Sequence, residues 1–263
     1  MTTSSDERRR QVAVEQYASS TTKLDARAAL HRHFSIATQP WHEWVLAQIA
    51  LAPGETLVEV GAGTGLLWTA NVGGLPGGSR LHLTDMSMAM CRRLRAQVPE
   101  ATSVCCSDAQ QLPFRGQVAD VLVANHMLYH VPDQQAALSE AARVLRRTGR
   151  AVFATNGGEH MKELASILTA VGLPSLGSDP THRAFTLEAA PDVVGSVFPR
   201  VELAEFRDGL RVTEPDALVA YIESFAAVNA EQRRRLPEEI KARMVDGCLA
   251  ITKSAGIVKA ALT

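Results

Sequence analysis

Glu59 and the glycines after it are the residues whose types and spacing most directly suggest chemistry. They lie in LVEVGAGTGLL (57–67), where an apolar segment leads into a carboxylate and then into Gly61, Gly63 and Gly65. Glycines at a strand end let the backbone approach a ligand closely, because no side chain intervenes. A carboxylate there opposes a pyrophosphate, which prefers helix amides and the positive end of the helix dipole. The stretch therefore favours a cationic ligand.

The spacing also differs from that of a dinucleotide-binding turn. Such a turn has glycine or alanine at its sixth position, where this chain has Leu66. A nicotinamide-dependent oxidoreductase is therefore disfavoured. S-adenosylmethionine carries both an ammonium and a sulfonium group, and it suits Glu59 better.

Two acidic residues follow later apolar segments. Asp85 comes about twenty residues after the glycine turn, the reach at which a carboxylate accepts hydrogen bonds from ribose hydroxyls. The alternative is that Asp85 caps the helix that begins near Ser87. Asp108 precedes AQQLPF and is a second candidate for binding a ligand. The alternative is that it only forms a local turn, where Asp is common.

Histidines supply the candidate bases. Asn125 and His126 come at the end of a strand, where open α/β sheets bind their ligands. His126 and His130 share the spacing of a helical metal pair, but no third ligand accompanies them, so no metal is predicted. His31 and His33 are alternate residues of a helix and point apart.

Short β-rich runs alternate with helical patterns through the middle of the chain, which predicts a parallel sheet with helices on both faces. The expected strands are 56–60, 79–84, 102–106, 120–124 and 150–155. The expected helices are 66–72, 87–98 and 133–145, the last stopped by Gly149. Three helical stretches, 6–18, 23–34 and 40–51, precede the first strand.

The organisation is predicted in three parts. Residues 1–52 form an N-terminal helical lid, 53–156 the cofactor-binding core, and 157–263 a substrate cap with strands that complete the sheet. Helices are expected within 185–198 and 214–225. RVELAEFRDGLRV (200–212) is a strand or a hairpin around Asp208-Gly209, and 254–262 is a last strand.

The order of these motifs resembles that of the class I S-adenosylmethionine-dependent methyltransferases, in particular the small-molecule group with the ubiquinone and menaquinone methyltransferases. EVGAGTG is similar to the first motif of that family, LHLTDMS to the second and CSDAQQLPF to the third. ADVLVANHMLYHVPD is similar to the fourth-strand motif, and RVLRRTGRAVFATN to the helix and fifth strand. The resemblance implies an α/β, Rossmann-like, doubly wound, mostly parallel sheet of seven strands.

The resemblance also assigns roles. It implies that Asp85 binds the ribose of S-adenosylmethionine and that the Asp108 carboxylate and the Ala109 amide bind its adenine. Asn125 is then expected to lie by the methionine part of the same cofactor. The expected cofactor-binding residues are Tyr17, Glu59, Gly61, Ala62, Gly63, Gly65, Asp85, Met86, Asp108, Ala109, Asn125 and His126. A general base is optional, with His126 the first candidate and His31 and Tyr17 from the lid behind it. Trp41 and Trp44 are either core or part of the inner face of the lid.

Composition narrows the partners. A net charge of -1 and a pI near 6.7 disfavour nucleic acid, and no apolar run reaches the roughly 18 residues of a membrane span. Four cysteines without a CxxC pair fit a reducing cytoplasm. We expect the acceptor to be an apolar or aromatic small molecule of natural product biosynthesis. We expect the protein to be a monomer or a homodimer. An RNA methyltransferase and a non-catalytic cofactor-binding protein remain the alternatives.

Overall fold

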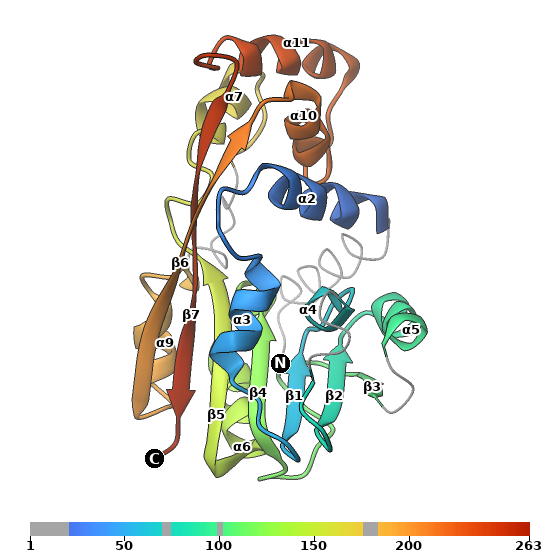
Figure 1. Ribbon diagram of the computed structural model, residues 1–263, viewed down its shortest axis with the longest axis vertical. Helices are drawn as coiled ribbons and strands as arrows, with labels where there is room; N and C mark the ends of the chain where they lie inside the picture. The colour runs from blue at the N-terminus through green and yellow to red at the C-terminus, as the bar shows by residue number, and fades with distance from the viewer. Residues whose placement is uncertain (1–20, 70–74, 99–101, 176–183) are drawn as a thin grey trace.

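The computed structural model describes residues 21–69, 75–98, 102–175 and 184–263. They contain a seven-stranded sheet of order β3-β2-β1-β4-β5-β7-β6, in which β7 runs antiparallel to both of its neighbours (Figure 1). The predicted α/β, Rossmann-like, mostly parallel sheet of seven strands is confirmed. The expected helix over 6–18 lies outside the described residues.

The elements follow the predicted alternation closely in the first part of the sheet. The strands are β1 (Thr56–Val60), β2 (Arg80–Asp85), β3 (Ser103–Cys106), β4 (Ala119–Asn125), β5 (Leu145–Asn156), β6 (Arg200–Val212) and β7 (Leu249–Ala261). The helices are α2 (Thr21–Phe34), α3 (Trp41–Ile49), α4 (Leu66–Thr69), α5 (Met88–Gln97), the 3-10 turn η1 (Leu128–His130), α6 (Gln134–Val144), α7 (Leu164–Ala170), α9 (Ala190–Gly195), α10 (Pro215–Glu223) and α11 (Ala230–Lys241).

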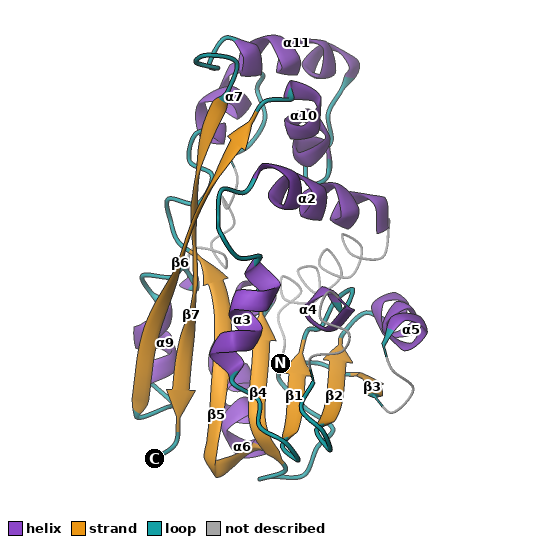
Figure 2. Ribbon diagram, viewed as in Figure 1, coloured by secondary structure: helices purple, strands orange, loops and turns teal. Residues whose placement is uncertain are grey.

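Helices cover both faces of the sheet, as a doubly wound fold requires (Figure 2). On one face, Val45 and Ile49 of α3 pack with Leu67 of α4 and Leu94 of α5 over the apolar side chains of β1, β2, β4 and β5. On the other face, Leu138 of α6 packs with residues of α9 over β1, β4, β5 and β7. The strands are buried on both sides, which explains why they read as continuous apolar runs.

A cap stands above the sheet and has a hydrophobic core of its own. The strands β6 and β7 are each thirteen residues long and continue past the end of β5 into the cap, where they meet α2, α7, α10 and α11 (Figure 1). Leu30 of α2 and Leu218 and Ile222 of α10 pack there against Leu210 and Ile251 of the two strands. The cap is thus held together by segments from both ends of the chain.

One local prediction was wrong. Gly149 does not stop a helix, because α6 ends at Val144 and 145–149 already belong to β5. A Cβ at Gly149 would lie 2.8 Å from the Asp120 carbonyl oxygen, so the glycine allows close strand packing instead. Of the two alternatives for 200–212, the single strand is confirmed and the hairpin is not formed. Gly209 makes room there for Ile36, whose amide donates to the Gly209 carbonyl.

One buried carboxylate fixes the junction between cap and sheet. Asp208 of β6 forms an ion pair with Lys253 of β7, and the two side chains are 0% and 8% exposed. Its Oδ1 also accepts from the Ser35 hydroxyl at 2.8 Å and from the Ile36 and Ala37 amides at 3.2 and 3.0 Å. Residues 35–37 link α2 to α3, so Asp208 ties the N-terminal helices to the long strands.

Replacing Lys253 by Met should therefore destabilise the protein by about 3 kcal/mol, because Asp208 would remain buried without its cation. Adding Asp208→Asn to this variant should restore part of the loss. Denaturant unfolding measures both. Lys162→Met, which removes an exposed ion pair with Glu159, is the control and should leave stability unchanged. Equal stability of wild type and the Lys253→Met variant would contradict this account of the junction.

Candidate functional site

The glycine turn joins β1 to α4 and leaves its centre open. Gly61, Gly63 and Gly65 have φ angles of +69°, +57° and +75°, which side chains rarely allow. A Cβ at Gly61 would lie 2.8 Å from Met127, and one at Gly65 would lie 2.7 Å from Leu94, so these two glycines are needed for packing. A Cβ at Gly63 would meet nothing within 4 Å. The turn therefore offers bare backbone to a ligand at Gly63.

Glu59 lies beneath this turn and is buried, with 2% exposure. The Trp68 indole nitrogen of α4 donates a hydrogen bond to its carboxylate. The pKa of Glu59 is raised to about 7. Burial is the main cause and the nearby Asp85 adds to it, while the Trp68 hydrogen bond acts in the opposite direction. Such a group carries a negative charge most readily when a cation is close. This environment fits the predicted role of Glu59, with Trp68 as a partner that the sequence did not reveal.

Asp85 connects the glycine turn to the loop before α5. Its Oδ2 accepts from the Gly63 amide at 2.9 Å, and its Oδ1 accepts from the Ser87 amide at 2.8 Å. Ser87, and not Asp85, is the N-cap of α5, because its hydroxyl accepts from the Met90 amide. Burial raises the pKa of Asp85. The helix-cap alternative is therefore excluded, and the ribose role stays a prediction.

The remaining predicted residues on this side line the same end of the sheet. Asp108 makes a local turn in which its carboxylate accepts from the Gln110 amide at 2.9 Å, so the local role is present whatever the ligand. Ala109 beside it is buried, and Met86 at the end of β2 is 37% exposed. β2 and β3 pair in register from His82↔Ser103 to Asp85↔Cys106, which brings these loops together.

Asn125, the last residue of β4, and His126 after it carry polar atoms that have no hydrogen-bond partner. The Asn125 Oδ1 and His126 Nδ1 atoms are buried and accept or donate no hydrogen bond. His126 has a φ of +54°, an unusual conformation for a residue other than glycine, and such strain is found mostly at functional sites. Its ring lies 4.9 Å from that of Trp41, centroid to centroid. Burial lowers the pKa of His126 to about 3.

Cap residues complete the site above His126. The His31 ring of α2 lies 6.1 Å from that of His160, which follows β5, and 5.7 Å from Tyr221 of α10. Burial lowers the pKa of His31 to about 3 and that of His160 to about 4. His33 lies on the exposed side of α2, as its spacing from His31 predicted.

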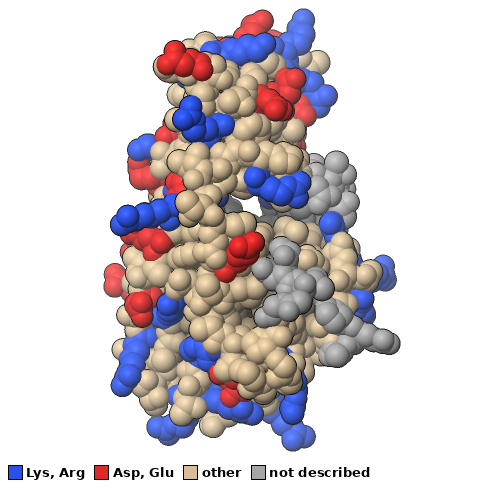
Figure 3. All heavy atoms as spheres, viewed as in Figure 1, with Lys and Arg blue, Asp and Glu red and all other residues tan. Residues whose placement is uncertain are grey.

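Aromatic side chains from α3 and β6 form a wall beside these histidines. Trp41 and Trp44 contact each other and Phe206, with centroid distances of 5.2 to 5.4 Å. Both tryptophans pack on the apolar cluster under α3, so they are core and site wall at once. Figure 3 shows the surface hollowed where cap and sheet meet.

The sequence missed several residues of this site. His160, Phe206 and Lys253 have no local motif around them. The long pairing of β6 with β7 brings Phe206 and Lys253 here, and backbone hydrogen bonds from Gly157 and Met161 to β7 place His160. Tyr17, predicted as a cover and as a catalytic residue, lies outside the described residues. His130 contacts Tyr129, and the described residues contain no group of three metal-binding side chains.

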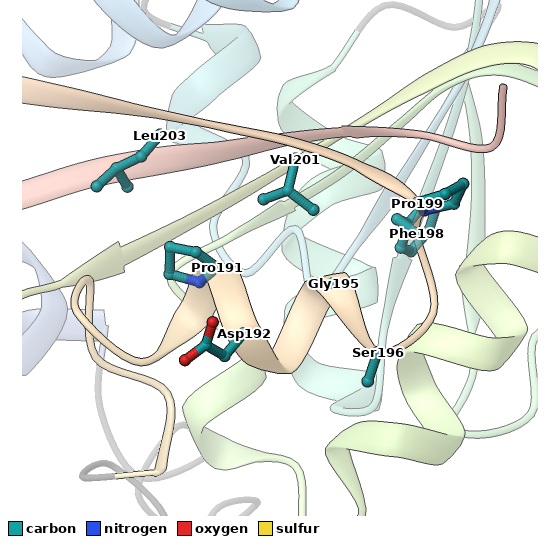
Figure 4. A pocket seen from close by; sticks show the side chains of 8 residues that line it. All are labelled: Pro191, Asp192, Gly195, Ser196, Phe198, Pro199, Val201 and Leu203. Carbon is teal, nitrogen blue, oxygen red and sulfur yellow. The ribbon is translucent and has the colours of Figure 1, made fainter.

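Another cavity lies far from this chemistry. It occupies about 670 Å³ between α9 and the edge strand β6 (Figure 4). Its lining mixes polar and apolar groups, with Asp192 as its only charged side chain. The lining residues are Pro191, Asp192, Gly195, Ser196, Phe198, Pro199, Val201 and Leu203. The lining has no histidine, and the Asp192 carboxylate is on an exposed residue, unlike the buried Glu59.

Comparison with known proteins agrees with the first site. Residues 58–153 match the family described as "Methyltransferase domain", which confirms the resemblance drawn from the motifs. A malonyl-[acyl-carrier protein] O-methyltransferase of Geobacter sulfurreducens is 32% identical over 134 residues, 49% of this chain and 50% of that protein. The ubiquinone/menaquinone biosynthesis C-methyltransferase UbiE of Ralstonia nicotianae is 29% identical over 113 residues, 42% of this chain and 46% of that protein.

Solved structures share the fold. A Bacillus halodurans protein described as a candidate methyltransferase has a TM-score of 0.60 at 16% identity, over 84% of this chain and 98% of its own. Phosphoethanolamine N-methyltransferase 2 of Haemonchus contortus, solved with S-adenosyl-L-methionine, has a TM-score of 0.56 at 14% identity, over 94% of this chain and 58% of its own.

The chain spans about half the length of the curated relatives it matches. The matched region ends before the cap strands, so the comparisons bear on the turn and the cofactor more than on the acceptor. They support S-adenosyl-L-methionine as the cofactor. The open backbone at Gly63, the acid beneath it and the unpaired Asn125 oxygen fit that molecule.

The pKa of Glu59 can be tested without any ligand. A raised pKa in the folded state favours folding below the usual value near 4.5, and this contribution is lost as the pH rises through about 7. Glu59→Gln keeps an acceptor for Trp68 but cannot ionise. Its unfolding free energy should therefore improve relative to wild type by up to about 3 kcal/mol between pH 4.5 and 8. Glu202→Gln, on an exposed residue, is the control, and a flat difference for Glu59→Gln would refute the buried-acid account.

Proposed function

We propose that this chain is an S-adenosylmethionine-dependent methyltransferase that methylates a small molecule held between the sheet and the cap. The observation that carries the proposal is the meeting of two features at one end of the sheet. An open glycine turn over a buried acid lies beside unpaired polar atoms on Asn125 and His126. The turn, the buried acid and the Asn125 oxygen suit a cationic cofactor, and the His126 nitrogen suits a polar acceptor.

The cofactor, when bound, supplies a methyl group on a positively charged sulfur. The residues of the chain then act mainly by alignment and by excluding water, since an in-line displacement needs little else. Gly61, Ala62, Gly63 and Gly65 would form the bare turn, and Asp85 would accept from the ribose while it holds Gly63. Asp108 and Ala109 would meet adenine, and Met86 would lie beside them.

Residues of the cap and of the adjacent sheet end would align the acceptor. The aromatic wall of Trp41, Trp44 and Phe206 suits an apolar or aromatic acceptor, and His31 and His126 lie where such a molecule would meet the methyl group. With a pKa of about 3 both imidazoles are neutral at pH 7, so they act as hydrogen-bonding partners more readily than as strong bases. Tyr17 keeps its proposed role as a cover.

Two further properties belong to this proposal. The four cysteines are free thiols, which fits the reducing cytoplasm where we place the enzyme.

The face seen in Figure 3 mixes acidic and basic side chains and shows no continuous basic track, which supports a small-molecule acceptor over RNA. No helix among the described residues is long and apolar enough to cross a membrane. A role in natural product biosynthesis is a proposal from composition alone.

Asp85→Ala should lower the affinity for S-adenosylmethionine and for its demethylated product at least tenfold, measured by calorimetry, because two charge-assisted hydrogen bonds would be lost. Asp85→Asn, which keeps one acceptor oxygen, separates ligand contact from support of Gly63. Asp192→Ala in the cavity of Figure 4 is the matched control.

Unchanged binding by Asp85→Ala would remove that residue from the cofactor site, and weakened binding by Asp192→Ala would move the site to the other cavity. Transfer of a labelled methyl group to members of a small-molecule panel then tests turnover. Cofactor binding without transfer to any acceptor would favour a non-catalytic protein, and transfer to RNA alone would favour the nucleic-acid alternative.

A further inference from the structure

Four histidines from four separate segments gather around the proposed acceptor position. They are His31 of α2, His42 of α3, His126 after β4 and His160 after β5, and we call them the histidine cluster. Lys253 is close enough to lower the pKa of all four. Segments so far apart in sequence meet only because the cap closes on the sheet, so the cluster is a property of the assembled site.

Buried polar atoms without a hydrogen-bond partner gather at the cluster in the described structure. The Nδ1 atoms of His31, His126 and His160 are such atoms, and so is Nε1 of Trp41, whose ring lies 4.9 Å from that of His126. An unpaired buried polar group costs about 1–3 kcal/mol, and folded proteins keep few of them. Their concentration at one place indicates a ligand with several hydrogen-bonding atoms.

The charges that face the cluster favour an anion. Asp208 is the nearest carboxylate, and it raises the pKa of His31 and His160. It is already engaged by Lys253, by the Ser35 hydroxyl and by backbone amides, which leaves little of its charge for a cationic ligand. Glu163 acts on His160 but binds Thr252 through both of its oxygens.

The other neighbours add no free negative charge. Tyr221 packs edge-on against His31, and burial raises the pKa of its phenol to about 12, so it is neutral. Arg27 reaches the same helix end and binds the Ser224 carbonyl and hydroxyl. A cationic acceptor such as an ammonium would find no available carboxylate here. An anion would find several imidazoles and the Lys253 ammonium, which has N–H donors beyond the one in its ion pair with Asp208.

We propose that the histidine cluster binds the methyl acceptor as an oxygen anion, a carboxylate or a phenolate, with the ammonium of Lys253, which is shared with Asp208, as an additional donor. This inference rests on the proposed function. Burial keeps the imidazoles neutral in the free protein, so an arriving anion would raise their pKa values and draw a proton into the site. Neutral imidazoles also do not repel the positively charged methyl donor, which occupies the adjacent end of the sheet.

The transfer step balances without an external base. The acceptor oxygen forms a bond to the methyl carbon as the carbon–sulfur bond breaks and its electron pair stays on sulfur. The anion and the sulfonium both become neutral, giving a methyl ester or a methyl ether and a thioether. A proton taken up with the anion leaves when the neutral product departs, since the imidazole pKa then returns to its low value.

The test titrates the full chain, saturated with S-adenosylhomocysteine, with matched aromatic probes: carboxylic acids, phenols, and the corresponding amides, methyl ethers and amines. Calorimetry in buffers of different ionisation enthalpy measures proton uptake. We expect acids or phenols to bind at least tenfold more tightly than their uncharged or amine counterparts. Acids, already ionised at pH 7, should bind with net proton uptake, whereas a phenol should pass its own proton to an imidazole without net uptake. The carboxylic acid and phenol arms distinguish the two oxygen anions.

Variants assign the effect to the cluster. His160→Gln and His31→Gln keep a hydrogen-bonding side chain but cannot take up a proton. Each should weaken anion binding at least fivefold and reduce proton uptake, with unchanged affinity for S-adenosylhomocysteine. His33→Gln, on the exposed face of α2, is the matched control. Thermal unfolding confirms that each variant is folded.

Three outcomes overturn the inference: acids and phenols fail to bind, amines or amides bind equally well, or carboxylic acids bind without proton uptake and independently of His31 and His160. If the chain binds S-adenosylhomocysteine in any of these cases, only this inference fails. If it does not bind S-adenosylhomocysteine, the proposed function fails first.

Discussion

The buried carboxylate of Asp208 is the interaction on which the arrangement of cap and sheet depends. It joins β6 to β7 through Lys253 and holds the linker between α2 and α3 through Ser35 and two backbone amides. Burying a charge is costly unless it is paired and hydrogen-bonded, so this geometry has few alternatives. The position of the cap above the sheet, and of His31 above His126, follows from it.

The two halves of the site divide their work by electrostatics. In the proposed cofactor half, burial suppresses the charge of Glu59, which lies under the glycine turn. The cap half has imidazoles whose charge is suppressed in the same way. Each half thus stays nearly neutral when empty and can gain charge when a ligand of opposite sign arrives. Desolvation of both halves strengthens the attraction between a cationic donor and an anionic acceptor.

The sequence predicted the strands and the glycine turn of the proposed cofactor half well because their determinants are local. The strand before Glu59, the glycines and Asp85 lie in short motifs whose spacing sets their geometry. The cap could not be predicted in this way. The pairing of β6 with β7 is a long-range contact, and Gly209, at the centre of the possible hairpin, makes room for Ile36. Lys253 reaches the site through that pairing and His160 through backbone hydrogen bonds of its neighbours to β7, so no local motif marked either residue.

The central claim is that one crevice, under the cap and beside the glycine turn, holds the methyl group to be transferred. Nuclear Overhauser contacts from the carbon-13 methyl group of bound S-adenosylmethionine test it most directly. The account predicts contacts to ring protons of His126 or Trp41. A bound methyl group that contacts neither ring, and instead contacts Val201 or Leu203 in the cavity beside α9, would contradict it.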